Sequence, residues 1–589
     1  MMPNLIDKIG DWNPQLLREL KGRLKFFNIA IAVAASLLLQ LVVFLYQFRE
    51  FPDDKYSLTN IYCRLSQAYQ QQNQALQQSN QSRIADYDNL ILNNICPQNE
   101  IDWQLWWRDH WEYIFLTFSV IFVFTLLVAG TYLIINDLAK EETRGTLNFI
   151  RLSPQSETNI LTGKLLGVPS LIFLVILVSL PLHLWAGYSA QIAFASILSY
   201  YAILAASCIF FYSTALLFGL VSNKFSGFQP WLGSGAVFIF LIIPILMAPS
   251  SSYSSNNSVV WFTLFNPVDT TNYLFPNFFH LTNGSPLTKL EFFYLPIGRN
   301  FVSLIGFHLL NFGLCSYGIF QALKRCFRNP QASMINKGQS YLFIAFSQMM
   351  MWGFILQHWD QISNIDQQIE QNQSLTLVGV YNFISLFSFI AILSPHRQAV
   401  QDWARYRHQE FSSRKSVWQD LIWAERSPAI VAIAINLAIV SIPWLVWISL
   451  TSILDTDHSP NWAHDNLDRL KVLSSVALSI SIIMIYATIA QLILLLKTPK
   501  RSFWAIGTIG AVTFVPPIIL EFLGISSWKY PTVWLFSTFP WAALQYSEAT
   551  TIFMAFLTQL SVLALLNFQL TKQVRLAGES ATKALLAGR

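Results

Sequence analysis

The run FFNIAIAVAASLLLQLVVFLYQF, residues 26–48, decides the fold class of this chain. It carries no charged residue, and it exceeds the roughly 20 apolar residues that an α-helix needs to cross the hydrocarbon core of a bilayer. A basic segment precedes it, with Arg18, Lys21, Arg23 and Lys25. A secretory signal has a shorter apolar region followed by small residues at a cleavage site. The run therefore predicts an uncleaved first membrane span, with the N-terminus in the cytoplasm.

The composition of the whole chain agrees with lipid as its main solvent. Of its 589 residues, 53% are hydrophobic and only 12% are charged, against about 25% charged residues in soluble domains. The net charge of +5 is small, and Lys and Arg are dispersed over short loops. Nucleic-acid-binding proteins instead gather basic residues on one face, so no nucleic acid partner is expected.

Eleven further apolar runs are long enough to span a membrane, which predicts an all-α polytopic membrane protein with about twelve transmembrane helices in two six-span halves. A short run near 533–544 is a candidate re-entrant segment. The predicted spans lie near 26–48, 113–136, 162–187, 191–221, 228–249, 298–322, 339–357, 377–394, 429–453, 472–497, 503–524 and 549–570.

The distribution of basic residues sets the orientation. Lys and Arg concentrate in loops on the cytoplasmic side of membrane proteins. Loops at alternate positions carry Lys324 and Arg325, Arg405 and Arg407, and Lys572. This parity places both termini in the cytoplasm and favours a bacterial plasma (inner) membrane.

Two long loops are then external, 49–112 and about 250–297. The first is rich in Gln and Asn, and its residues 65–90 form either a polar helical hairpin or a solvated spacer. Cys63 and Cys96 bracket this element, and in an oxidising compartment they can close it with a disulfide. The aromatic residues of the second loop are expected to form an interfacial belt.

The N-terminal segment predicts a short amphipathic helix. Asn13 suits the N-cap and Pro14 the first helical position. Leu16, Leu17 and Leu20 follow at helical spacing. Such a helix is expected to lie along the inner membrane surface.

One cytoplasmic loop is not explained by membrane insertion alone. It reads DLAKEETRGTLNFIRLSPQSETNILTGKLL, residues 137–166. Glu141 and Glu142 are expected to open a helical turn, where negative charge is favourable. Gly145 is expected mid-helix, as a mark of close approach by another backbone. Ser153 and Pro154 are expected to end this helix and to cap the next.

These residues resemble the first cytoplasmic loop of the permease subunits of ATP-binding-cassette (ABC) transporters of the type-two exporter class. That loop carries an acidic pair, a Gly-Thr-Leu step, a Ser-Pro and a Gly-Lys before the third span. The resemblance implies a coupling helix that docks into a separate ATPase, with an interface of Glu141, Glu142, Arg144, Gly145, Thr146, Leu147, Ser153, Pro154, Gly163 and Lys164. It also implies a connecting helix marked by Asn13, Pro14, Arg18 and Glu19.

The resemblance gives a domain division. Residues 1–25 are the connecting helix, and 26–325 are a six-span permease-like unit with external loop 49–112 and coupling loop 137–161. Residues 326–589 are a second six-span half. Its cytoplasmic loop, about 395–428, lacks both the Gly-Thr-Leu step and the Gly-Lys pair. This half is therefore either a degenerate second permease unit or an accessory domain.

No catalytic, cofactor-binding or metal-binding residues are expected. The sequence has no GxxxxGK[ST] phosphate loop and no His/Cys set with metal-ligand spacing. ATP and Mg are expected in the partner ATPase. Other expected partners are membrane lipid and another permease copy.

Within the predicted spans, His308 and Asn311 are expected to bond between helices, and His183 is a weaker pathway candidate. The scarcity of buried charge argues against a proton-coupled pump and suits a greasy or amphipathic substrate. The alternatives are a non-transporting membrane anchor with the same fold and, less favoured, a lipid-modifying enzyme.

Overall fold

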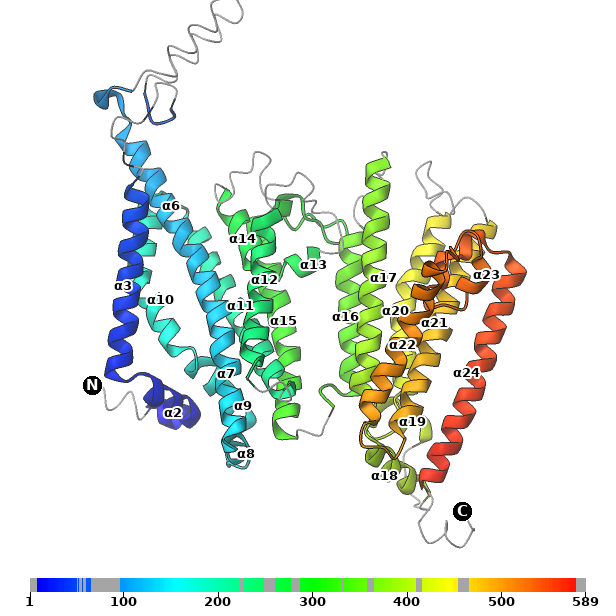
Figure 1. Ribbon diagram of the computed structural model, residues 1–589. Coiled ribbons are helices and arrows are strands. Elements are labelled where there is room, and N and C mark those ends of the chain that lie inside the picture. The colour runs from blue at the N-terminus through cyan, green and yellow to red at the C-terminus, as the bar shows by residue number, and fades with distance from the viewer. Residues whose placement is uncertain are drawn as a thin grey trace, which may run out of the picture. The chain divides into compact units, whose positions relative to one another are not determined.

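The computed structural model describes residues 8–49, 51, 56, 60–64, 96–222, 227–247, 260–276, 286–329, 333–356, 365–408, 416–453 and 466–578. Over these residues the chain is helical and forms no strand (Figure 1). Eleven of the described helices are long and apolar enough to span a membrane. The chain is thus a multi-pass integral membrane protein.

Eleven of the twelve predicted spans match these helices. The twelfth, near 339–357, is the helix α16, Lys337–Ile355, which is not among the eleven sufficiently long and apolar ones. Its polar side chains Ser340, Ser347 and Gln348 are buried. Two of them bond to neighbouring helices, where Ser340 accepts from Asn436 and Gln348 donates to Asn382.

The described helices divide into two compact units, one extending to Arg328 and the other beginning at Asn329. Residues 260–261 and 290–296 belong with the second unit. The first unit contains α2 (Pro14–Arg23), α3 (Phe26–Phe48), α6 (Trp103–Phe124), the π-helical turn η2 (Thr125–Ala129), α7 (Gly130–Thr143), α8 (Thr146–Arg151), α9 (Glu157–Gly167), α10 (Ser170–Ser189), α11 (Phe194–Val221), α12 (Gln229–Met247), α14 (Pro267–Leu274), η4 (Pro286–Lys289) and α15 (Phe301–Arg328).

Two predicted spans of this unit have different ends. The second runs from Trp103 to Thr143 without interruption, so it extends beyond the apolar run on both sides. The third was expected from 162, but α9 and α10 are separate helices that meet at Val168-Pro169. Proline has no amide hydrogen to continue the helical ladder, so a break there is expected. Gly163 and Lys164 therefore lie on α9, ahead of the span.

At the end of the unit opposite α8 and α9, α14 is inserted into the bundle (Figure 1). Asn266 caps it by accepting from the amide of Val268, and its Nδ2 donates to the carbonyl of Phe240 at 2.7 Å. The expected interfacial role is wrong for Phe265, which is 9% exposed and stacks on Phe210. This aromatic ring belongs to the core because α14 carries its loop inward.

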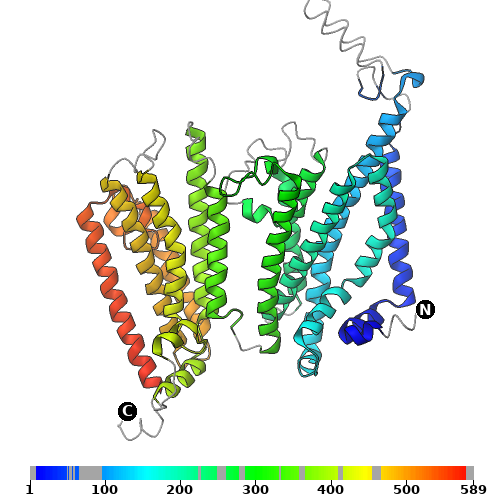
Figure 2. The same cartoon turned by 180° about the vertical axis from the view of Figure 1, so that it is seen from behind.

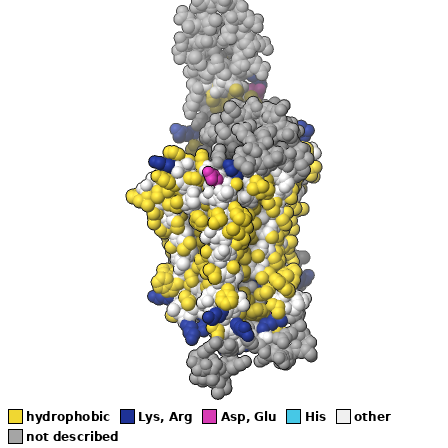
Figure 3. Space-filling model, turned by 90° about the vertical axis from the view of Figure 1, so that its right-hand side faces the viewer, with side chains coloured by type: hydrophobic (Ala, Val, Ile, Leu, Met, Phe, Trp, Pro, Cys, Tyr) yellow, Lys and Arg dark blue, Asp and Glu magenta, His cyan; other side chains and the backbone are white. Residues whose placement is uncertain are grey.

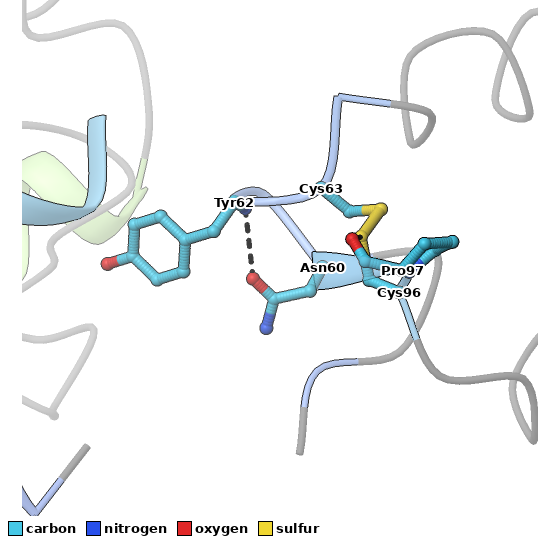
Figure 4. The surroundings of a disulfide bond; sticks show 5 residues. All are labelled: Asn60, Tyr62, Cys63, Cys96 and Pro97. Atoms are coloured by element: carbon cyan, nitrogen blue, oxygen red, sulfur yellow. Dashed lines mark hydrogen bonds between the residues drawn. A yellow bond between two sulfur atoms is a disulfide. The ribbon is translucent and has the colours of Figure 1, made fainter. Parts of the chain in front are cut away.

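A disulfide joins Cys63 to Cys96 (Figure 4). Around it, the amide of Cys96 donates to the carbonyl of Tyr56, and the amide of Asp102 donates to the carbonyl of Tyr62. Asp102 in turn caps α6. The disulfide therefore anchors both ends of the Gln-rich excursion at the head of the second span. The predicted hairpin at 65–90 lies outside the described residues.

The second unit contains α16, α17 (Ile365–Leu393), α18 (Arg397–His408), α19 (Val417–Trp423), α20 (Ile430–Ile453), α21 (Asn466–Leu494), α22 (Arg501–Phe522), α23 (Pro531–Trp534), the 3-10 turns η7 (Pro540–Ala542) and η8 (Leu544–Tyr546), and α24 (Ala549–Gly578). Figure 2 shows the same helices from behind. Leu535 and Ala543 pack on Leu478 and Ile552, so the segment near 533–544 folds onto the bundle as short helical turns.

The outer surface of this unit is suited to lipid. Figure 3 shows hydrophobic side chains over the middle of the face, with Lys and Arg gathered at its lower end. Many large apolar side chains of α22 and α24 are exposed, among them Phe503, Phe522 and Phe568. Water would make this exposure unfavourable, whereas lipid provides it with an apolar environment.

Candidate functional site

The helix α2 is capped and attached to α9 by the same side chain. Asn13 Oδ1 accepts from the amide of Leu16 at 2.9 Å, and Pro14 occupies the first helical position, as expected. Asn13 Nδ2 donates to the carbonyl of Asn159 at 2.8 Å and to Thr162 Oγ1 at 3.2 Å. The residue that caps the connecting helix α2 thus also bonds it to α9, the helix that precedes the third span.

Two glycines of α9 allow α2 to approach closely. A Cβ added at Gly163 would lie 2.8 Å from the backbone nitrogen of Leu16, and one at Gly167 would lie 2.5 Å from Glu19 Cβ. Small residues four apart on one helix face permit such contact. The face of α2 buried here carries Gln15, Leu16 and Glu19. The expected apolar stripe is therefore divided, since Leu17 and Leu20 remain partly exposed.

Lys164 is the centre of an ion-pair network between α2, α7 and α9. Its ammonium lies 2.7 Å from Glu141 Oε2, 2.9 Å from Asp137 Oδ2 and 3.7 Å from Glu19 Oε1, and the side chain is 1% exposed. Arg23 pairs with both Asp137 and Glu19, and Arg18 pairs with Glu141 at 3.3 Å. Three cations thus meet three carboxylates, and the cluster is neutral as a whole.

The three carboxylates lie close enough together to hold a metal ion, but a cation of the chain itself lies against them. Burial alone would lower the pKa of Lys164, yet the charges of Asp137, Glu141 and Glu19 raise it above the ordinary value of lysine. Lys164 therefore keeps its charge at neutral pH. A buried network of this kind is stable only while each charge has its partner.

The acidic pair closes a helix instead of opening one. Glu141 and Glu142 lie in the last turn of α7, so the expectation that they begin a helix is wrong. The glycine that follows is also not mid-helix. Gly145 lies between α7 and α8 with φ 72°, and nothing lies within 4 Å of where its Cβ would be. Its role in this chain is the left-handed turn, which other residues adopt only with strain.

The helix α8 presents opposite faces to the chain and to the outside. Leu147 and Ile150 are 2% and 4% exposed, so they form the buried edge that the sequence predicts. Phe149 and Leu152, in contrast, are 78% and 85% exposed. Arg144 is exposed before the helix, and Thr146 Oγ1 donates to the carbonyl of Glu141.

The link from α8 to α9 differs from the expected one. Ser153 and Pro154 follow the end of α8, but the cap of the next helix is Ser156, whose Oγ accepts from the amide of Asn159. Glu157 follows in the first turn and pairs with Arg328 at the end of α15. The loop is thus attached to the last helix of the unit as well.

The two histidines are buried in the first unit away from this site. His183 contacts Ser119 Oγ at 3.0 Å and Tyr201 Oη at 2.6 Å. His308 contacts the carbonyl of Leu264 at 3.1 Å, which lies in the segment leading to α14. Both are polar links between segments. His308 on α15 also contacts Thr270 Oγ1 on α14 at 3.5 Å, so it joins two helices as expected.

Several residues of the site were not predicted from the sequence: Arg23, Asp137, Ser156, Asn159, Gly167, Phe149 and Leu152. A signal existed for two of them. Asp137 and Glu141 are four apart, which places both on one helix face, and Gly163 and Gly167 have the spacing of a helix-packing pair.

The fold and this site define a multi-pass membrane protein whose loop between the second and third spans is held by buried ion pairs. A family model described as ABC-2 family transporter protein matches residues 24–323, slightly more than half of the chain. The chain belongs to this family, whose members are membrane subunits and typically non-catalytic permeases. The match ends before the second unit. No curated protein and no solved structure matches the chain.

Proposed function

We propose that this chain is the permease subunit of an ABC exporter in a bacterial plasma membrane, with both termini in the cytoplasm. A separate ATPase subunit binds ATP and Mg and hydrolyses the nucleotide. The chain carries no catalytic residue and provides the path for a greasy or amphipathic substrate.

One observation carries the proposal: α8 exposes Phe149 and Leu152 from a base that buried ion pairs hold in place. Exposed apolar side chains beside a positive charge, here Arg144, are typical of a protein interface. They fit an apolar groove with an acidic rim on the ATPase.

The network offers a route from this contact to the spans. The site joins α2, which precedes the first span, to α7, which ends the second, and to α9, which precedes the third. Lys164 of α9 pairs with carboxylates of α2 and α7, so these three helices are linked. Since α8 lies between α7 and α9 in the chain, a displacement of α8 moves them together. Closure of the ATPase on ATP is thus converted into movement of the helices.

The test is to solubilise the tagged chain gently from its native membrane and identify the proteins that co-purify in stoichiometric amount. We expect a soluble protein with a phosphate-binding loop, and the amount that co-purifies should fall in preparations of F149E/L152E. The matched control F149L/L152M keeps the apolar surface and should retain it. Both positions are exposed, so the melting temperature of the chain should not change.

A folded wild-type chain that repeatedly brings down no ATPase would overturn the proposal. It would favour a non-transporting membrane anchor instead.

A further inference from the structure

The second unit repeats the order of elements found in the first. Each contains six long helices. In each, short helices lie between the second and third, α8 and α9 in one unit and α18 and α19 in the other. In each, short helical segments between the fifth and sixth fold onto the bundle, α14 in one and α23, η7 and η8 in the other.

The packing of the long helices repeats as well. The fourth helix packs mainly on the sixth in both units, as α11 on α15 and as α21 on α24. The first packs on the third, as α3 on α10 and as α16 on α20. These two pairings are therefore shared, whereas the contacts of α20 with α21 and of α7 with α12 have no counterpart of similar extent in the other unit.

In each unit a buried lysine connects the region where the first long helix begins to the region that precedes the third long helix. Lys164, on the helix before the third span, reaches the segment before the first span. Lys337, at the start of α16, reaches the end of α19, where it donates to the carbonyl of Leu421 at 2.8 Å and to Ser427 Oγ. Each lysine is 1% exposed. In the first unit the helix before the first long helix is bound to the segment before the third, and in the second unit the first turn of the first long helix makes that contact.

Glycine is placed in the same reciprocal way. Gly163 of α9 admits α2, whereas Gly338 of α16 admits the ring of Trp423 on α19, which lies 3.0 Å from where a Cβ would be. The contact between these two segments is shared by both units. The lysine and glycine that make it lie before the third long helix in the first unit and at the start of the first long helix in the second. This accounts for the missing Gly-Lys pair in the second loop.

The tip of this loop has the same character as α8. Asp420 joins the two short helices, since it pairs with Arg407 and accepts from Trp403 Nε1. Val417 and Trp418 are 52% and 69% exposed at the start of α19, and Arg426 is exposed just after that helix. An exposed apolar pair again lies on a short helix that an ion pair holds in place.

We propose that Val417 and Trp418 form a second docking surface for a second copy of the same ATPase. A groove with an apolar floor that accepts Phe149 and Leu152 also suits the apolar side chains of this surface. One chain then supplies both permease units of the transporter and recruits two ATPase subunits. The inference rests on the proposed function, because it takes the first ATPase contact at α8 as given.

The test is the number of ATPase subunits per chain, measured by native mass spectrometry of the complex that co-purifies with the wild-type chain. We expect two ATPase subunits with one chain. V417E/W418E should reduce the ratio to one, F149E/L152E should also reduce it to one, and the four substitutions together should abolish binding. V417L/W418F keeps the apolar surface and should retain both subunits.

A photo-crosslinking residue at 418 gives a second readout that does not depend on loss of binding. It should capture the same ATPase peptide as one at 149. A crosslinker at Trp528 is the matched control, because this exposed tryptophan lies three residues before α23, and α23 is at the opposite end of the unit from α18 and α19 (Figure 1).

The inference fails if the ratio is unaffected by V417E/W418E, or if position 418 captures only lipid, as an interfacial tryptophan would. A ratio of one ATPase per chain that depends only on α8 would refute it while leaving the permease proposal intact. Absence of any ATPase from the wild-type preparation would instead refute the proposed function.

Discussion

Replacing Lys164 by methionine should release the connecting helix from its site. Methionine has similar length and is flexible enough to fill the space, so the change removes mainly the charge. Glu19, Asp137 and Glu141 would then face only Arg18 and Arg23, which leaves one buried negative charge without a partner.

Removing one partner from a buried ion pair destabilises by about 3–5 kcal/mol. Arg18 is half exposed and near Glu141, so we expect the lower limit, about 3 kcal/mol. If α2 opens locally, this corresponds to roughly 150-fold faster hydrogen exchange of its backbone amides.

The assay is hydrogen exchange with mass spectrometry on residues 14–23 of the purified chain. The double variant K164M/E141Q provides the decisive comparison, because two carboxylates then face two arginines and the cluster is neutral again. It should exchange more slowly than K164M alone. Unchanged exchange in K164M, or a double variant no better than the single one, would refute the charge-balance argument.

Four further predictions follow from the same region and from the disulfide. Gly167→Ala places a Cβ 2.5 Å from Glu19 Cβ and should weaken α2 docking by about 1–3 kcal/mol, which speeds hydrogen exchange of the α2 amides. Gly22→Ala adds its Cβ in open space and should slow that exchange. Equal exchange rates of the α2 amides in the two variants would contradict this. Gly145→Ala, at φ 72°, should lower stability by about 1–2 kcal/mol in thermal melts, and Gly145→Asn by less, since Asn tolerates this conformation; Ala and wild type melting alike would be evidence against it. Reducing Cys63–Cys96, which closes a separation of 33 residues, should remove about 4 kcal/mol from the external element and speed exchange at 96–102 only; faster exchange in the spans would show a wider role. Because the pKa of Lys164 is raised, its stabilisation is complete below the ordinary lysine pKa and is lost only as pH rises through the higher folded value, so α2 protection, corrected for intrinsic exchange, should not fall between pH 7 and 9.5.

The sequence was sufficient for the spans because each is a local property. The run 26–48 and the helix Phe26–Phe48 coincide, since length and apolarity alone decide whether a helix can cross lipid. The cap of α2 was also predictable, because Asn13 and Pro14 act on their own helix. Where polar residues interrupt the pattern, as in α16, burial among neighbouring helices compensates.

The site was predicted only in part because its contacts join distant segments. Lys164 meets Glu19, 145 positions earlier in the chain, and no local pattern indicates this partner. Gly145 was misplaced for a different reason. Its sequence neighbours favour a continuous helix, and only the left-handed turn, required for Leu147 and Ile150 to face inward, shows why glycine is there.

The most direct test of the account is photo-crosslinking from positions 149 and 152 in intact native membranes, followed by identification of the captured protein. The account predicts one soluble protein with a phosphate-binding loop, captured from both positions and not from Trp185, an exposed tryptophan near the other end of the same unit. Capture of lipid alone, or of the chain itself, would contradict the claim that α8 is the contact for an ATPase.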